Sequence, residues 1–306
     1  MKSSETVFRI LMLILLTLCL SAFAMAPPLT FTFNDVIAPG AKQTDSYAIN
    51  DAGVIAGDYI DSADVQHGMI LNGTNLTTVD NAKCTTTSLS FYGINSAGTV
   101  VGWCFSKKTA APLSFTYANG KFATVAYPKA SWTEASGIND KGEVVGFYYA
   151  NKGGLIRGFS LIKKKYKEIN VKGAVATEAW GVNNAGSITL ITGGNGGGAG
   201  VTCSSTTPCV SYVLTGKNLT KISDPSAGPD GTAVHAPDNQ GDVDGTVYDS
   251  AGNRHGFLLH GGTYYDFDDP DGTNQTRADG LNDSLQLVGR YTDSANVTHG
   301  FIAQAQ

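Results

Sequence analysis

The sequence predicts an all-β fold, a six-bladed β-propeller of four-stranded blades, on three observations. One short motif recurs six times along the chain, each repeat unit has room for four short strands, and the last unit stops one strand short. No segment after the first 26 residues shows helical periodicity. We therefore expect residues 25–306 to form a single propeller domain.

The repeated motif first occurs as AINDAGVIAGDY at residues 48–59. Five further copies follow at steps of 45, 44, 44, 55 and 44 residues, a period typical of propeller blades. The long step reflects a Gly- and Cys-rich insertion at about 193–209. The motif places one Asn, or an Asp in the fifth copy, in every unit: Asn50, Asn95, Asn139, Asn183, Asp238 and Asn282.

Each unit contains four short β-rich runs bounded by turn residues: a strand that ends at the Asn, a second through a segment such as VVG, a third around HGF, and a fourth such as YKEIN. The Asn and the Gly three residues later are typical of the first and last positions of a type I turn. A calcium loop is the alternative, but it needs oxygen ligands at alternate positions and a distal acid, which the motif lacks. We expect a hairpin corner, no metal and no cofactor.

The two ends of the domain match each other. The last copy ends at THGFIAQAQ, after its third strand, and the exported chain begins with FTFNDVIAPG, which resembles fourth-strand segments such as YYDFDDPDG. We therefore expect residues 31–37 to pair with residues 299–302 and to complete the sixth blade. Such a closure leaves no exposed edge strand.

The first 24 residues read as a cleaved signal peptide. Lys2 and Arg9 precede an apolar run over residues 10–20, and Ala22-Phe23-Ala24 supplies the small residues that a signal peptidase needs. A membrane anchor is disfavoured because the run is shorter than the roughly 20 residues that span a bilayer. We expect a secreted or periplasmic protein that has no membrane association after cleavage.

The net charge and the cysteines indicate which partners and which disulfides to expect. Without the signal, 19 basic residues face 25 acidic ones, and the longest basic run is residues 163–165, so nucleic acid is a poor partner. Four cysteines remain, an even number with no zinc spacing. We predict two disulfides, Cys84–Cys104 and Cys203–Cys209, and a monomer.

Three units carry a His-Gly-aromatic or His-Gly-Met triplet: His67-Gly68-Met69, His255-Gly256-Phe257 and His299-Gly300-Phe301. On these triplets and the repeat, the chain resembles the HAF family of extracellular repeat proteins over nearly all of its exported length. The other units depart from the triplet, with Arg157, Leu113 and Val210 in place of the histidine. The resemblance implies an exported bacterial protein with propeller-like repeats, and it implies no activity.

Aligning the units on their Asn shows which residues begin the first strand of each blade, where the central channel opens. One position holds Thr in five of the six units, and the next holds three acids and one Arg. A ring of ligand-contacting groups is one interpretation, and solvated charges at strand starts are the other. The candidate ligand-binding residues at this channel mouth are Asp45, Thr133, Glu134, Thr177, Glu178 and Arg277.

Aromatic residues and histidines add candidates on the same face. Tyr59, Tyr248 and Tyr291 are candidate rim residues for sugars or peptides. The repeated histidines are expected to bond within blade turns, because residues that stabilise blades recur. The tryptophans favour burial between blades over a role as sugar platforms; they are Trp103, Trp132 and Trp180.

The sequence therefore predicts a non-catalytic exported module that binds carbohydrate or peptide through one propeller face. A sugar-active hydrolase that uses Glu134 and Glu178 is the first alternative. A structural envelope or extracellular matrix protein is the second. No GxSxG nucleophile turn and no sialidase-type Asp box is present, and repeated polar residues favour binding over catalysis.

Overall fold

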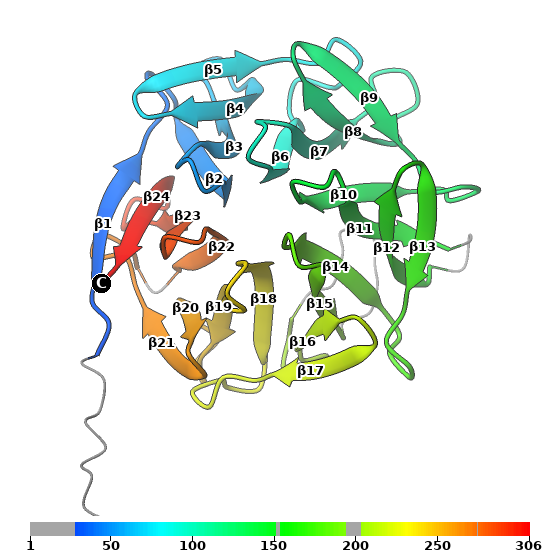
Figure 1. Ribbon diagram of the computed structural model, residues 1–306. Coiled ribbons are helices and arrows are strands. Elements are labelled where there is room, and N and C mark those ends of the chain that lie inside the picture. The colour runs from blue at the N-terminus through cyan, green and yellow to red at the C-terminus, as the bar shows by residue number, and fades with distance from the viewer. Residues whose placement is uncertain (1–27, 151–153, 194–202, 274) are drawn as a thin grey trace, which may run out of the picture. The chain divides into compact units, whose positions relative to one another are not determined.

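The computed structural model describes residues 28–150, 154–193, 203–273 and 275–306. Residues 31–306 form one compact unit. Within the described residues, 24 strands and no helix form six four-stranded antiparallel sheets arranged in a ring about a central axis (Figure 1). The prediction of a six-bladed β-propeller is confirmed. The predicted signal peptide lies outside the described residues.

The first three blades follow the chain directly. The first contains β2 (Gln43–Ile49), β3 (Ile55–Ile60), β4 (Gln66–Asn72) and β5 (Asn75–Val79). The second contains β6 (Ser90–Ile94), β7 (Val100–Phe105), β8 (Pro112–Ala118) and β9 (Lys121–Val125). The third contains β10 (Thr133–Ile138), β11 (Val144–Tyr149), β12 (Ile156–Ile162) and β13 (Lys165–Ile169).

The last three blades repeat this order, except that the sixth takes its outer strand from the start of the unit. The fourth contains β14 (Thr177–Val182), β15 (Ser187–Thr192), β16 (Val210–Thr215) and β17 (Asn218–Ile222). The fifth contains β18 (Thr232–Pro237), β19 (Val243–Tyr248), β20 (Arg254–His260) and β21 (Thr263–Phe267). The sixth contains β22 (Arg277–Leu281), β23 (Gln286–Thr292), β24 (Thr298–Ala305) and β1 (Phe31–Val36).

The pairing of β1 with β24 joins the two ends of the unit. The strands run antiparallel, with Phe31 opposite Ala305 and Val36 opposite Gly300. Ile37 follows the strand and is 57% exposed. Figure 1 shows β1 in blue lying along the red β24.

Steric hindrance explains the glycine at the end of the VVG segment. In all six blades a β-bulge interrupts the pairing of the first strand with the second. At Gly102, a Cβ atom would lie 2.0 Å from the backbone oxygen of Ser90, and at Gly146 it would lie 1.9 Å from that of Glu134. The absence of a side chain at the glycine therefore lets the first strand lie close to the second at the bulge. The bulge in turn sets the direction in which side chains of the first strand point toward the channel.

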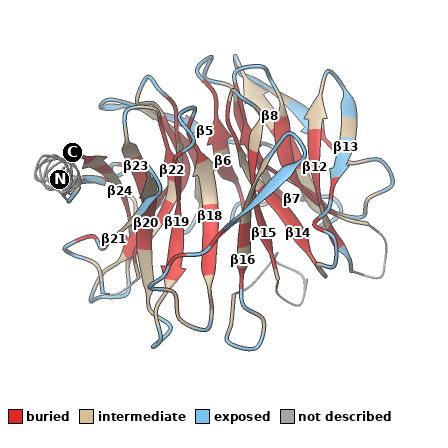
Figure 2. Ribbon diagram, turned by 60° about the horizontal axis from the view of Figure 1, so that its bottom comes forward, coloured by how far each residue is buried: buried red, intermediate tan, exposed pale blue. Residues whose placement is uncertain are grey.

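The core lies between neighbouring sheets, and the third strands supply many of its largest side chains. The aromatic residue of the HGF segment is fully or almost fully buried in four blades, and Met69 replaces it in the first. Figure 2 shows burial concentrated in the strands and exposure in the turns and the outer strands. Burying these side chains between blades supplies the main driving force for assembly. The four aromatic residues are Phe115, Phe159, Phe257 and Phe301.

The repeated histidines bond within their own blades, as predicted. His67 uses Nδ1 to contact Asp80 at 2.7 Å and Nε2 to contact Asp61 at 3.4 Å. His255 makes the equivalent pair of contacts with Asp268 and Asp249, which tie the third strand to the turn before it and to the end of the fourth strand.

Both predicted disulfides are present, Cys84–Cys104 and Cys203–Cys209. The first ties the segment before β6 to β7, and the second closes the C-terminal part of the insertion between β15 and β16. Residues 194–202 of the insertion lie outside the described residues. Two disulfides are typical of proteins in oxidising compartments.

Candidate functional site

The channel has two chemically different ends, and the repeated turns narrow one of them. The side-chain Nδ2 of Asn50 donates to the backbone oxygen of Asn95 at 3.0 Å, while its Oδ1 accepts from the backbone of its own turn. The same link passes from Asn95 to Asn139 and onward to the fifth blade, and Asn282 returns it to Asn50 at 3.1 Å. We call this set of turns the Asn ring.

An apolar layer lies directly inside the Asn ring. Its six side chains line both the central cavity and a small hollow of about 70 Å³ at the Asn ring. The Asn ring and this layer together narrow the channel at that end. The apolar residues are Ile49, Ile94, Ile138, Val182, Pro237 and Leu281.

The opposite end opens into three hollows that share lining residues. The first, which we call the aromatic hollow, has a volume of about 270 Å³ and belongs to the second, third and fourth blades. Its aromatic side chains pack against one another; Trp103 lies 5.1 Å from Phe105 and 6.3 Å from Trp132 between ring centroids. The aromatic lining consists of Tyr92, Trp103, Phe105, Trp132, Phe147 and Trp180.

Glu134 is the carboxyl group of the aromatic hollow. It is the second residue of β10, and its Oε1 accepts a hydrogen bond from the indole Nε1 of Trp132. Burial raises the pKa of Glu134 to about 7, and the bond from Trp132 partly offsets this effect. At neutral pH the hollow therefore combines apolar ring faces with a carboxyl group that is able to donate or accept a hydrogen bond.

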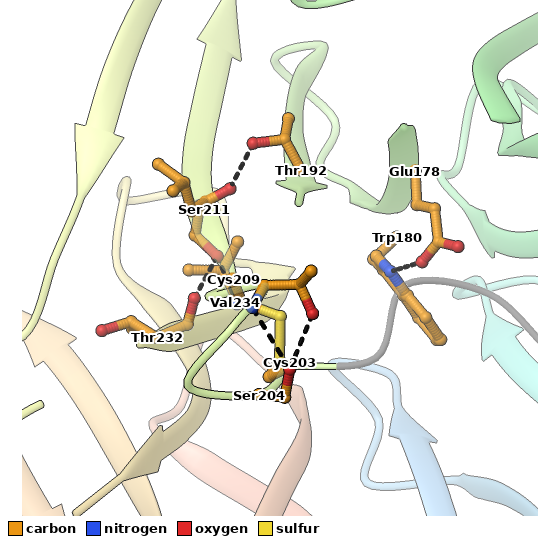
Figure 3. The surroundings of a disulfide bond; sticks show 11 residues. Glu178, Trp180, Thr192, Cys203, Ser204, Cys209, Ser211, Thr232 and Val234 are labelled. Carbon is orange, nitrogen blue, oxygen red and sulfur yellow. Dashed lines mark hydrogen bonds between the residues drawn. A yellow bond between two sulfur atoms is a disulfide. The ribbon is translucent and has the colours of Figure 1, made fainter. Parts of the chain in front are cut away.

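The second hollow, the central cavity, has a volume of about 290 Å³ and lies in the channel itself. It shares Tyr92, Ser136 and Trp180 with the aromatic hollow. The Cys203–Cys209 disulfide forms part of its wall and belongs to the same hydrophobic cluster as Trp180. Figure 3 shows the disulfide and the bond from Trp180 to Glu178.

The third hollow, the arginine hollow, has a volume of about 340 Å³ and shares Tyr47, Arg277 and Arg290 with the central cavity. Arg290 is held by the protein: it lies 3.5 Å from Asp45 Oδ1 and 3.8 Å from Asp279 Oδ2, and its guanidinium is 4.7 Å from the ring centroid of Tyr47. Arg254 donates to Gln275 Oε1 at 3.1 Å.

Three of the six predicted mouth residues line these hollows: Asp45 and Arg277 in the arginine hollow and Glu134 in the aromatic hollow. The expectation for Thr133 and Thr177 needs correction. Both are buried, and each hydroxyl accepts a backbone N–H from the segment that links two blades, Tyr127 N at 3.0 Å and Val171 N at 3.1 Å. The recurrence of Thr at this position of the repeat therefore reflects its hydrogen bond to the segment that links two blades.

Glu178 also departs from the expectation. Its exposed fraction is 0%, and it accepts a hydrogen bond from Trp180 Nε1 at 3.2 Å. Trp180 lines the central cavity and the aromatic hollow, whereas Glu178 lines neither.

Of the three predicted rim tyrosines, one lines the central cavity and two lie outside the three hollows. Tyr248 lines the central cavity, and the guanidinium of Arg254 lies 5.8 Å from its ring centroid. Tyr291 is 3% exposed and donates to Asp35 Oδ1 at 3.0 Å, so it is not a rim residue. Tyr59 bonds to Thr78 and stacks on His67 within its own blade, away from the three hollows.

Sequence reasoning missed the residues that define the central cavity. The residue three positions before each turn Asn or Asp lines it in every blade, and its identity differs strongly from blade to blade. This variation inside an otherwise regular repeat is the signal that could have found the site. The six residues are Tyr47, Tyr92, Ser136, Trp180, His235 and Asp279.

Comparison with solved structures places the chain among diverse propellers. A TolB-type protein of Agrobacterium tumefaciens matches with a TM-score of 0.56 at 10% identity, over 91% of this chain and 98% of that one. The lectin of Aleuria aurantia, a six-bladed propeller that recognises fucose, matches with a TM-score of 0.51 at 10% identity, over 88% and 93%. A gluconolactonase of Xanthomonas campestris matches with a TM-score of 0.50 at 11% identity, over 92% and 96%.

These likenesses show the fold and no more, since the three proteins differ in function. No family model matches the chain, and no curated sequence is significantly similar to it, so the resemblance to the HAF family stays a prediction. Among the described residues, no helix has the length and apolar character needed to cross a membrane.

Proposed function

We propose that this chain is an exported carbohydrate-binding protein whose ligand enters the mouth of the channel. The observation that carries this proposal is the aromatic hollow, where Trp103, Phe105 and Trp132 surround a buried carboxyl group on Glu134. Sugar rings offer apolar C–H faces to aromatic rings and hydroxyl groups to carboxylates, and this hollow supplies both kinds of partner.

Position on the fold also supports binding at this end. The mouth is where the blades differ from one another, and its three hollows are joined through shared residues. The fold is shared with a lectin that recognises fucose, although likeness at 10% identity carries no ligand over to this chain. The two disulfides support export to an oxidising compartment.

The hydrolase alternative is weakened by the burial of Glu178. Glycoside hydrolysis uses two carboxyl groups that flank the scissile bond. Glu134 lines the aromatic hollow, but Glu178 is shielded behind Trp180 and has an exposed fraction of 0%. The proposed pair therefore does not face a common substrate in the mouth.

A glycan array and a peptide array, followed by calorimetric titration of the best ligand, test the proposal. We expect glycan binding that the Trp103→Ala variant weakens at least tenfold, because it removes one wall of the aromatic hollow. Tyr59→Ala is the matched control, since Tyr59 is a partly exposed tyrosine outside the three hollows, and it should leave the affinity unchanged. Circular dichroism establishes that both variants fold.

Each other outcome contradicts the proposal. Sugar release by the wild type that is lost in Glu134→Gln would support a hydrolase. Binding to peptides alone would move the function to peptide recognition, and binding to neither array would favour a structural protein. An equal loss in Trp103→Ala and Tyr59→Ala would place the site elsewhere.

A further inference from the structure

The two halves of the mouth are chemically unlike. The aromatic hollow belongs to the second, third and fourth blades and carries one carboxyl group. The arginine hollow belongs to the first, fifth and sixth blades and carries Arg254, Arg277 and Arg290 together with glutamine and threonine side chains. The central cavity connects the two, because it shares residues with each.

The charges of the arginine hollow do not all cancel within the protein. Asp45 and Asp279 face Arg290. Asp58 is 1% exposed, and burial and the neighbouring Asp45 raise its pKa, so that it tends to be protonated and neutral. Arg254 is engaged by Gln275, a neutral partner. With Asp58 neutral, the three arginines exceed the two carboxylates Asp45 and Asp279 by one positive charge.

Arg277 is the most informative of these groups. It lines both the central cavity and the arginine hollow, and it is partly buried. Within the described part of the chain, no hydrogen bond or ion pair is formed by its guanidinium. An anionic group of a ligand in the central cavity would therefore find a guanidinium that no protein acceptor already holds.

We infer that the ligand is an acidic oligosaccharide, with one sugar ring in the aromatic hollow and the carboxylate of a neighbouring sugar unit on Arg277. This inference rests on the proposed carbohydrate-binding function and adds the class of sugar. The planar guanidinium matches a carboxylate through two parallel hydrogen bonds, which favours a carboxylate over a single hydroxyl group. Each hollow is close in volume to the lower end of ligand pockets, so one sugar unit fits each.

Titration calorimetry with trigalacturonate, its methyl ester and the corresponding neutral galactose trisaccharide tests this inference. The methyl ester is the matched ligand control, because it keeps the sugar and removes the charge. We expect the wild type to bind trigalacturonate at least tenfold more tightly than either neutral ligand. In Arg277→Gln the charged and the neutral ligands should bind with about equal affinity.

Arg277→Lys refines the assignment, because it keeps the charge and removes the planar fork. We expect it to retain a preference between those of the wild type and Arg277→Gln. A preference that persists in Arg277→Gln would overturn the role of Arg277. A sulfated galactose trisaccharide that binds more tightly than trigalacturonate would overturn the choice of a carboxylate.

The outcomes separate this inference from the proposed function. Equal binding of charged and neutral sugars would overturn the acidic-sugar inference and leave carbohydrate binding in place. The absence of binding to any of these sugars, combined with a blank glycan array, would overturn both. Thermal unfolding of each variant identifies any loss of binding that comes from misfolding.

Discussion

The two ends of the channel are built from the same six strands and yet follow opposite rules. At the Asn ring, nearly every blade contributes the same side chain, and that side chain makes the same bond to the next blade. At the mouth, one strand position carries a different side chain in almost every blade. Repetition therefore accompanies closure of the propeller, and variation accompanies the formation of a site.

One blade breaks the rule at the Asn ring. Asp238 accepts three backbone N–H bonds from its own turn through Oδ1, as the Asn side chains of the other turns accept theirs. Its buried Oδ2 has no hydrogen-bond partner among the described residues, and an ionised Asp has no N–H to donate to the next turn. The fifth turn thus lacks the bond that the other turns make to the next blade, and it contacts the sixth turn through Asn239 and Gln240, which donate to Asp283.

The largest expected effect is at an intact turn. Asn139→Ala removes the bond to Asn183 and two bonds to the backbone of its own turn. We expect it to lower the free energy of unfolding by about 2–3 kcal/mol, at about 1 kcal/mol for each lost bond. Chemical denaturation measures this change. Ligand affinity should stay unchanged, and a variant that loses affinity but keeps its stability would break the contrast between the two ends.

Asp238→Asn should supply the missing bond to the sixth blade and give a smaller effect of opposite sign. Burial raises the pKa of Asp238 to about 6, and Asp242 adds to the shift, so the wild type loses stability as the pH rises from about 4 to 6. We expect the variant to be more stable by about 1–2 kcal/mol at pH 8, and to differ little at pH 4. Denaturation at the two pH values measures the difference. A variant that is equally stable or less stable at pH 8 would show that the link is not missing.

The smallest expected effect is at the mouth, in Glu134→Gln. The folded pKa of Glu134, at about 7, lies above the unfolded value, so the folded protein keeps a proton that the unfolded chain loses. The wild type therefore loses stability as the pH rises from about 4.5 to 7, by about 1 kcal/mol after allowance for solvent screening. The variant should lack this loss while Gln keeps an acceptor for Trp132. If the unfolding free energy of the variant still falls between pH 4.5 and 7, this pH dependence belongs to another group.

Much of the architecture is determined by the sequence alone. The 44-residue period and the turn motif predict the blade and its hairpin corner, because Asn and Gly meet local backbone requirements that do not depend on distant residues. The cysteine pairs also follow from the chain, since each pair lies within one repeat unit. Because these local features recur in each repeat unit, a single sequence is enough to recognise them.

The tertiary structure alone decides which side chains face the mouth. Glu134 and Glu178 occupy the same position in adjacent units, yet only Glu134 lines a hollow. Two residues after Glu178, the indole of Trp180 bonds to that carboxylate and lines the cavity in its place, whereas the residue two after Glu134 is the small Ser136. Exposure here depends on the volume of neighbouring side chains and on the bulge that directs them, and neither can be read from the spacing of the repeat.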